Sequence, residues 1–141
     1  MVALVSDLAR RREHYSLLIA DHEDAPRRQM ESLLRTEGYE THLAAEATEA
    51  VEIVHRERID VVILEFELPQ LGGLETLRAM KMAVRSLVPC VFTAGKVSPR
   101  VQLAALSEDA FTVVPKPVDE VTLKNVVRSL IRRYFPWHSE G

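Results

Sequence analysis

The sequence predicts an α/β fold, with one open, doubly wound, mainly parallel sheet of about five strands and helices on both faces. Three observations predict it. Apolar, strand-like runs alternate with amphipathic, helix-like segments along the 141 residues. The run Val61–Leu64 is entirely aliphatic, as expected for a strand that is buried on both faces. Turn and helix-start residues such as Gly72–Gly73 and Ser98–Pro99 separate the segments.

The first strand and helix are predicted within residues 15–38. Tyr15–Ala20 is a short apolar run that leads into an acidic stretch. Asp24 is the expected N-cap of the helix, and Pro26 fits the first turn, where a missing N–H costs nothing. The helix is expected to stop at Gly38, because glycine readily adopts the left-handed conformation that ends helices.

The second and third units follow the same alternation. A weaker strand near Thr41–Ala44 precedes a helix whose apolar residues recur at i, i+3, i+4 and i+7. The Val61–Leu64 strand is followed by the glycine pair and a helix from about Leu74 to Val84.

The last two units complete the sheet. Val88–Thr93 is the fourth predicted strand, Ser98–Pro99 begins the fourth helix, and Phe111–Val114 is the fifth strand. The final helix has one apolar face, made of Leu123, Val126, Val127, Leu130, Ile131 and Tyr134.

Composition and charge limit the function classes. A length of 141 residues and a hydrophobic content of 47% predict one domain with a single core. The net charge of −3 gives no basic field, so neither nucleic acid nor a membrane surface is an expected partner. No apolar stretch approaches the ~20 residues that span a bilayer, and no signal peptide is recognisable, so we expect a cytoplasmic protein. The lone Cys90 lies in an apolar run and is expected to be a buried thiol.

Polar side chains follow the C-terminal ends of several predicted strands. Asp21 and His22 follow the first strand, Glu65 and Glu67 the third, Thr93 ends the fourth, and Lys116–Pro117 follows the fifth. Because ligands of open α/β sheets bind outside the carboxyl ends of the strands, we expect these groups to share one crevice.

The sequence around these positions resembles the receiver domain of two-component response regulators, the CheY-like family, which has a flavodoxin-like fold. The motifs are LLIADHED, DVVILEFELPQLGGLE, VFTAG and VPKPV, in that order. The resemblance divides the chain into an N-terminal extension (residues 1–14), a receiver-like domain (15–134) and a C-terminal tail (135–141). The extension could form a short amphipathic helix or fray.

The resemblance implies roles for the residues of the crevice. In that family an acidic pair and an aspartate bind Mg²⁺, and the aspartate accepts a phosphoryl group from a histidine kinase. A hydroxyl and a lysine then contact the oxygens of that phosphoryl group. The matching positions are Asp21 in the acidic pair, Thr93 as the hydroxyl and Lys116 as the lysine, which with Pro117 matches the family's cis-proline dipeptide. A possible Mg²⁺ site would comprise Asp21, Glu65 and the Glu67 carbonyl.

The sequence departs from the family pattern at the positions that carry this chemistry. Glu65 stands at the phosphoacceptor position in place of aspartate, His22 stands at the second acidic position, and Val113 replaces a common aromatic residue. Mg²⁺ accepts an imidazole reluctantly, so metal binding is in doubt. The extra methylene moves the Glu65 carboxylate outward by about 1.5 Å, which makes it a poor acceptor and brings its charge toward Lys116 and Thr93.

Three functional classes remain open. A pseudo-receiver that binds protein partners without phosphorylation ranks first, a weakly phosphorylatable receiver switch second, and a small flavodoxin-like enzyme last, so no catalytic residue is expected. A purely structural pair of Lys116 with Glu65 stays an alternative. His22 could also ligate a transition metal with Asp21 and Glu65, although a solvent-facing loop histidine is the simpler interpretation.

The expected partners are proteins: a histidine kinase or a downstream signalling protein. A homodimer could form through the face of the fourth helix, fifth strand and fifth helix, using Lys124, Arg128 and Arg132 on the exposed side of the last helix.

Overall fold

The structure, a computed structural model, describes residues 14–136 and contains one five-stranded parallel sheet in the order β2-β1-β3-β4-β5. The strands are β1 (Ser16–Ala20), β2 (Glu40–Ala44), β3 (Val61–Glu65), β4 (Cys90–Ala94) and β5 (Thr112–Pro115). The helices are α2 (Asp24–Thr36), α3 (Ala47–Arg56), α4 (Gly73–Val84), α5 (Pro99–Ser107) and α6 (Glu120–Tyr134). The predicted doubly wound, flavodoxin-like α/β fold is therefore confirmed.

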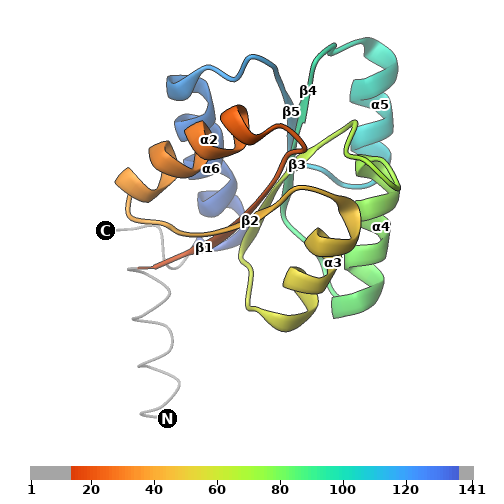
Figure 1. The fold of residues 1–141 in the computed structure, drawn as a ribbon, viewed down its shortest axis with the longest axis horizontal. Helices are drawn as coiled ribbons and strands as arrows, with labels where there is room; N and C mark the ends of the chain where they lie inside the picture. The colour runs from red at the N-terminus through yellow and green to blue at the C-terminus, as the bar shows by residue number, and fades with distance from the viewer. Residues whose placement is uncertain (1–13, 137–141) are drawn as a thin grey trace.

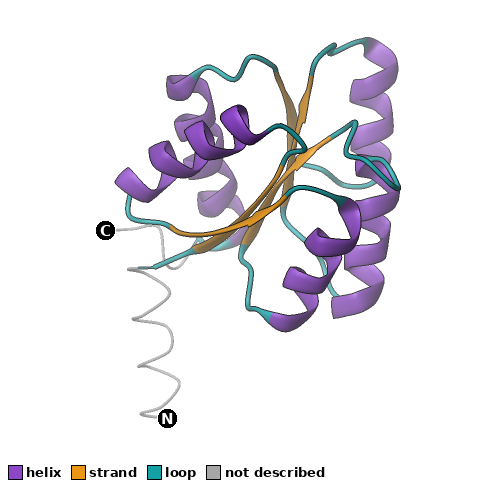
Figure 2. Cartoon of the chain, viewed as in Figure 1, coloured by secondary structure: helices purple, strands orange, loops and turns teal. Residues whose placement is uncertain are grey.

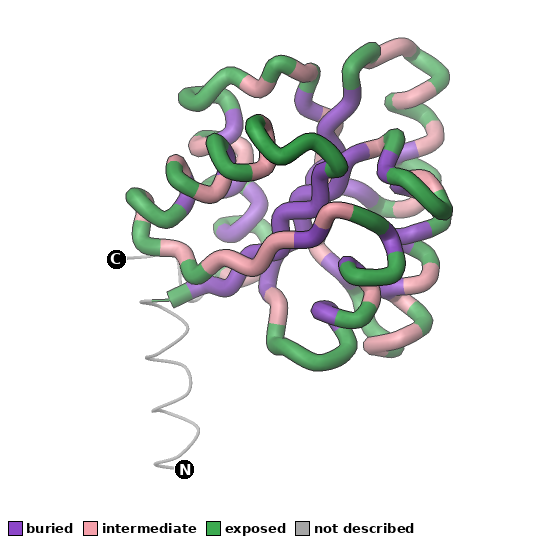
Figure 3. The backbone as a smooth tube through the Cα atoms, viewed as in Figure 1, coloured by how far each residue is buried: buried purple, intermediate pink, exposed green. Residues whose placement is uncertain are grey.

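Helices cover both faces of the sheet (Figure 1; Figure 2). One apolar layer lies between the sheet and α2 and α6, and includes Leu34 and Leu130. The other lies on the opposite face with α3, α4 and α5, and includes Leu77 and Phe92. The central strands are buried along their whole length (Figure 3), which is why their sequences are continuously apolar.

The start of α2 differs from the prediction. The N-cap is Glu23, with an extended backbone and no side-chain capping bond, so the expectation that Asp24 caps the helix is wrong. Asp24 is instead the first helical residue, and its carboxylate accepts hydrogen bonds from Arg27 and Arg28 one turn later. The helix ends beside Gly38, whose φ of +92° is the left-handed conformation expected there.

The N-terminus of α4 packs directly on the end of β3. A Cβ atom on Gly73 would lie 2.7 Å from the backbone oxygen of Glu65 and 2.8 Å from the Cα of Phe66. Only glycine allows this approach. The contact fixes the backbone from which the Glu65 side chain projects.

Smaller differences and the chain ends complete the picture. β4 begins at Cys90, and the thiol is buried as predicted, which raises its pKa. Phe135, assigned to the tail, is the C-cap of α6, and its ring packs against that of Tyr15 at a tilt of 49°, with ring centroids 5.5 Å apart. The other predictions for the extension and tail fall almost entirely outside the described residues. Between residues 14 and 136, no helix is long and apolar enough to cross a membrane.

Candidate functional site

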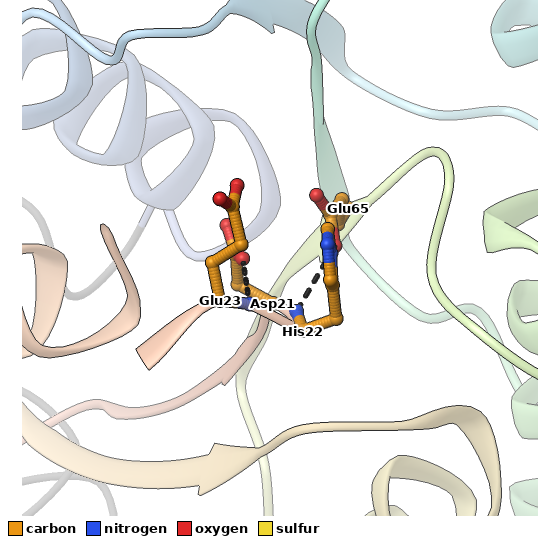
Figure 4. Close-up of side chains that lie close together, drawn as sticks. All are labelled: Asp21, His22, Glu23 and Glu65. Carbon is orange, nitrogen blue, oxygen red and sulfur yellow. Dashed lines mark hydrogen bonds and ion pairs between the residues drawn. The ribbon is translucent and has the colours of Figure 1, made fainter. Parts of the chain in front are cut away.

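The polar residues that follow β1, β3 and β5 meet at the C-terminal edge of the sheet. Figure 4 shows Asp21, His22 and Glu23, from the loop after β1, grouped beside Glu65 at the end of β3. Lys116, which follows β5, enters the same group. The predicted convergence of Asp21, His22, Glu65 and Lys116 is thus confirmed.

Glu65 is the centre of this group and is almost fully buried, with 3% of its side chain exposed. Its Oε1 accepts hydrogen bonds from the backbone N–H of His22 at 3.0 Å and lies 2.6 Å from the Nδ1 of the same residue. Its Oε2 accepts a hydrogen bond from the Lys116 ammonium at 2.6 Å. Both carboxylate oxygens are therefore engaged, which is what burial of a charged group requires.

Asp21 provides the second buried carboxylate. Its side chain is completely inaccessible, and its Oδ2 lies 3.0 Å from the Lys116 ammonium. Its Oδ1 accepts the backbone N–H of Glu23 at 2.8 Å. The Lys116 ammonium thus lies between two buried carboxylates, and we call Asp21, Glu65 and Lys116 the ion-pair triad.

The pKa shifts follow from these contacts. Burial raises the pKa of Glu65, but the hydrogen bonds from His22 and Lys116 outweigh it, so the pKa ends below its ordinary value. Burial likewise lowers the pKa of Lys116, and the hydrogen bond to Glu65 together with the adjacent Asp21 carboxylate more than reverses this. The hydrogen bond to Glu65 raises the pKa of His22. The contacts thus shift the pKa of each group in the direction that favours its charged form.

Two predicted members of the crevice are placed differently. The Thr93 hydroxyl is buried but has no hydrogen-bond partner among residues 14–136, so the expectation that Glu65 reaches it is wrong. The reason is that His22 and Lys116 take both oxygens of Glu65. The Glu67 carboxylate stands apart and accepts the backbone N–H of Gly95 at 3.4 Å. The Lys116–Pro117 peptide bond is cis, as expected.

His22 and Glu23 contact the charged groups of the crevice, which the sequence did not indicate. His22 is 45% exposed, but its ring is held by Glu65, so it is not simply a solvent-facing histidine. The Glu23 carboxylate lies 3.5 Å from the Lys116 ammonium. One ligand atom from each of Asp21, His22, Glu23 and Glu65 lies within 4.8 Å of all the others. The position of both residues directly after an apolar strand was the available signal.

The family of the chain follows from comparison with known proteins. A family model for the response regulator receiver domain matches residues 17–128. The chain belongs to the response regulator receiver family. Response regulator MprA from Mycobacterium leprae is 36% identical to this receiver domain over 121 residues, which cover 85% of this chain and 52% of that protein. The chain spans about half the length of the curated relatives that it matches.

Solved structures agree with this assignment. A response regulator receiver domain protein from Clostridium thermocellum is 27% identical, with a TM-score of 0.77, and the match covers 85% of this receiver domain and 96% of that chain. The chemotaxis protein CheY4 from Vibrio cholerae, at 24% identity and a TM-score of 0.79, shares the fold and covers 83% of this chain and 98% of its own.

Proposed function

We propose that this receiver domain acts as a pseudo-receiver, a protein-interaction module in signal transduction that works without phosphorylation at Glu65. The observation that carries the proposal is the ion-pair triad, in which Lys116 binds Glu65 directly. By the motif resemblance, Glu65 stands where a phosphoacceptor aspartate would, and Lys116 is the residue that would contact a phosphoryl oxygen. The Glu65 carboxylate itself supplies that contact here.

The triad opposes phosphoryl transfer to Glu65 for a geometric reason. Oε1 faces His22 and Oε2 faces Lys116, so neither oxygen is free to attack an incoming phosphorus. Transfer would require breaking the buried pair, and misplacement by about 1 Å alone costs roughly 10²-fold in rate.

The same contacts disfavour Mg²⁺. Receiver domains generally bind Mg²⁺ at an acidic pocket, and a cluster of acidic groups is present here. However, the buried oxygens of Asp21 and Glu65 already surround the Lys116 ammonium, and the neighbouring donor His22 is an imidazole. Mg²⁺ demands oxygen ligands in near-octahedral geometry. The residues in this arrangement do not fit the ion.

The module is held near one state by an incomplete substitute for a phosphoryl group. Glu65 adds a charge of about −1, against about −1.5 to −2 for a phosphoryl group. Its carboxylate contacts Lys116 but leaves the buried Thr93 hydroxyl without a partner. We infer constitutive, partial mimicry of the phosphorylated state.

The unpaired Thr93 hydroxyl also favours the second candidate, a weakly phosphorylatable switch. Thr93 pairs with Glu65 in the sheet register, and the two side chains project to the same face. A phosphoryl oxygen could accept the hydrogen bond that Thr93 does not make. This candidate ranks second because both Glu65 oxygens must first be released.

Two variants separate these candidates. Glu65→Asp shortens the side chain away from Lys116, and Glu65→Asp with His22→Asp also supplies a second oxygen ligand. Incubated with acetyl phosphate and Mg²⁺, the single variant is expected to gain little phosphate and the double variant more, as read from intact mass. Equal labelling of the two would show that His22 does not disturb the site.

The interaction surface that we propose is the face of α5, β5 and α6. We choose this face because Leu103 and Leu106, three residues apart and so neighbours on one side of α5, are 70% and 62% exposed. Lys124 and Arg128, chosen from the sequence, instead pair with Glu37 of α2 and so lie on the other side of α6. Arg132 follows Arg128 by one turn and so lies on the same side of α6, and we therefore propose that the docking face adjoins α5 without these three residues.

This surface is tested by association in solution. The double variant Leu103→Ser with Leu106→Ser is expected to abolish association through this face. The association lost is homodimerisation if the partner is a second copy, and otherwise the binding of a histidine kinase or a downstream signalling protein. Met82→Ser on α4, at 79% exposure, is the matched control and should leave association intact. Sedimentation velocity reports the oligomeric state. Association that survives in the double variant would place the interface elsewhere.

As for other receiver domains, which are signalling modules, we propose no enzymatic activity and a cytoplasmic location.

A further inference from the structure

The crevice continues beyond the ion-pair triad into a groove of about 630 Å³ between α2 and the segment that leads into α6. Figure 1 shows these two helices on the same face of the sheet. Sites for small organic molecules typically measure about 300–1,000 Å³ and combine apolar walls with a few polar groups. The groove has both the size and the mixed lining of such a site.

The walls of the groove are apolar. Pro26, Met30 and Leu33 follow one another at i, i+4 and i+7 and so lie on one face of α2. Val118 and Leu123 face them from the β5–α6 segment. Met30 and Leu123 are buried, whereas the other three are half-buried and keep surface available for contact.

The mouth of the groove carries an excess of negative charge. Its lining includes the carboxylates of Glu23, Glu65, Glu67 and Glu120, against the cations Lys116 and His22. Lys116 and His22 are already bound to Glu65. Glu67 and Glu120 are exposed, and among residues 14–136 the Glu120 side chain has no partner.

The helix termini do not offset this charge. The N-terminus of a helix ordinarily attracts anions. Here the first turn of α2 holds Asp24, and the N-cap of α6 is Asp119, whose carboxylate accepts the backbone N–H of Thr122. Because Asp24 is itself paired with Arg27 and Arg28, the attraction for a cation at the mouth rests on Glu67 and Glu120.

We propose that the groove binds a small organic cation with an apolar body, such as an arylalkyl amine. The ammonium group lies at the mouth with Glu67 and Glu120, and the apolar body lies against Leu33 and Val118. Helices in these units run antiparallel to their strands, so Glu120 stands at the mouth and Leu123 lies one turn deeper. The site does not depend on whether Glu65 can be phosphorylated, and it goes beyond the interaction function proposed above.

A matched series of probes tests the charge requirement. The probes are 2-(1-naphthyl)ethylamine, 2-(1-naphthyl)ethanol and 1-naphthaleneacetate, which share the apolar body and differ in charge. Binding is followed by amide chemical shifts of the labelled protein at low salt, where exposed charges are least screened. The amine is expected to bind up to about 5-fold more tightly than the alcohol, with the carboxylate weakest, because an exposed opposite charge contributes up to about 1 kcal/mol. Shifts should centre on α2 and the β5–α6 segment.

Variants locate the two halves of the site. Glu67→Gln with Glu120→Gln should weaken the amine toward the alcohol and leave the alcohol unchanged. Leu33→Ser should weaken all three probes, and thermal unfolding shows whether that variant keeps its fold. Glu52→Gln and Leu87→Ser, exposed and outside the groove, are the controls and should leave the binding of the three probes unchanged.

Several outcomes would overturn the proposal. These are equal binding of the three probes, amine binding that is insensitive to Glu67 and Glu120, or shifts centred away from the groove. The proposal would also be rejected if none of the three probes bound and a helix of a partner protein occupied the groove instead, which would assign the groove to a protein. None of these results bears on Glu65 phosphorylation, which is read from mass, so the two proposals fail separately.

Discussion

Replacing Lys116 with methionine removes the cation between two buried carboxylates and keeps most of the side-chain volume. Lys116 Nζ lies 2.6 Å from Glu65 Oε2 and 3.0 Å from Asp21 Oδ2, and only 13% of its side chain is exposed. Removing one partner of a buried ion pair typically costs about 3–5 kcal/mol, because the remaining charge stays buried without compensation. We expect Lys116→Met to lower the free energy of unfolding at pH 7 by about this amount. The midpoint temperature should then fall by roughly 10 °C or more.

The free energy of unfolding of Lys116→Met should depend on pH differently from that of the wild type. In the wild type the pKa of Glu65 is lowered, so Glu65 stabilises the fold above its unfolded pKa, and this stability is lost as the pH falls through the folded pKa. Without Lys116, we expect the pKa of Glu65 to rise above its unfolded value. The variant should therefore regain stability through Glu65 as the pH falls from 7 toward about 5, a gain that Glu65 does not give the wild type.

Urea unfolding at several pH values measures both effects. Lys96→Met, at an exposed position in the loop before α5, is the matched control and should change the free energy of unfolding by less than about 0.5 kcal/mol. Lys116→Met with Glu65→Gln should recover part of the loss, because one buried charge is removed as well. A loss below about 1 kcal/mol, as for an exposed pair, would refute the reasoning.

Two further predictions concern the surroundings of the triad. The pKa of His22, followed by NMR, should lie above 6.5, because the hydrogen bond to Glu65 raises it, and it should return toward 6.5 in Glu65→Gln. His22 therefore stabilises the fold below its unfolded pKa, and this contribution is lost as the pH rises through the folded pKa. An unchanged titration in that variant would contradict the contact. Gly73→Ala should lower the free energy of unfolding in urea by at least about 1–3 kcal/mol, because its Cβ would meet backbone atoms of Glu65 and Phe66. Gly95→Ala, with open space around it, is the control and should be nearly neutral. Equal effects of the two substitutions would contradict the packing of Gly73 on β3.

The fold could be predicted well because its signals are strong and local. Continuous apolar runs such as Val61–Leu64 mark strands buried on both faces, and the alternation with amphipathic helices leaves few topologies. Element ends were less certain. Glu23 and Asp24 can both begin a helix, and the sequence does not show that Arg27 and Arg28 draw Asp24 into the first turn.

The site was predicted in part. The ends of parallel strands bring Asp21, Glu65 and Lys116 to one edge whatever the side-chain conformations, so their convergence followed from topology. Which atoms pair depends on a few ångströms of side-chain reach. Glu65 turns toward His22 and Lys116 and leaves the Thr93 hydroxyl alone, which the sequence pattern does not encode. The side of α6 that carries Arg128 likewise depends on its long-range pair with Glu37.

The central claim is that Glu65, held by His22 and Lys116, does not accept a phosphoryl group. Its most direct test is the intact mass of the wild-type protein after incubation with acetyl phosphate and Mg²⁺, with a typical aspartate-bearing receiver domain treated in parallel as the positive control. We predict that the control gains a phosphoryl group and that this protein stays unmodified. A stoichiometric phosphate adduct that maps to Glu65 would contradict the account.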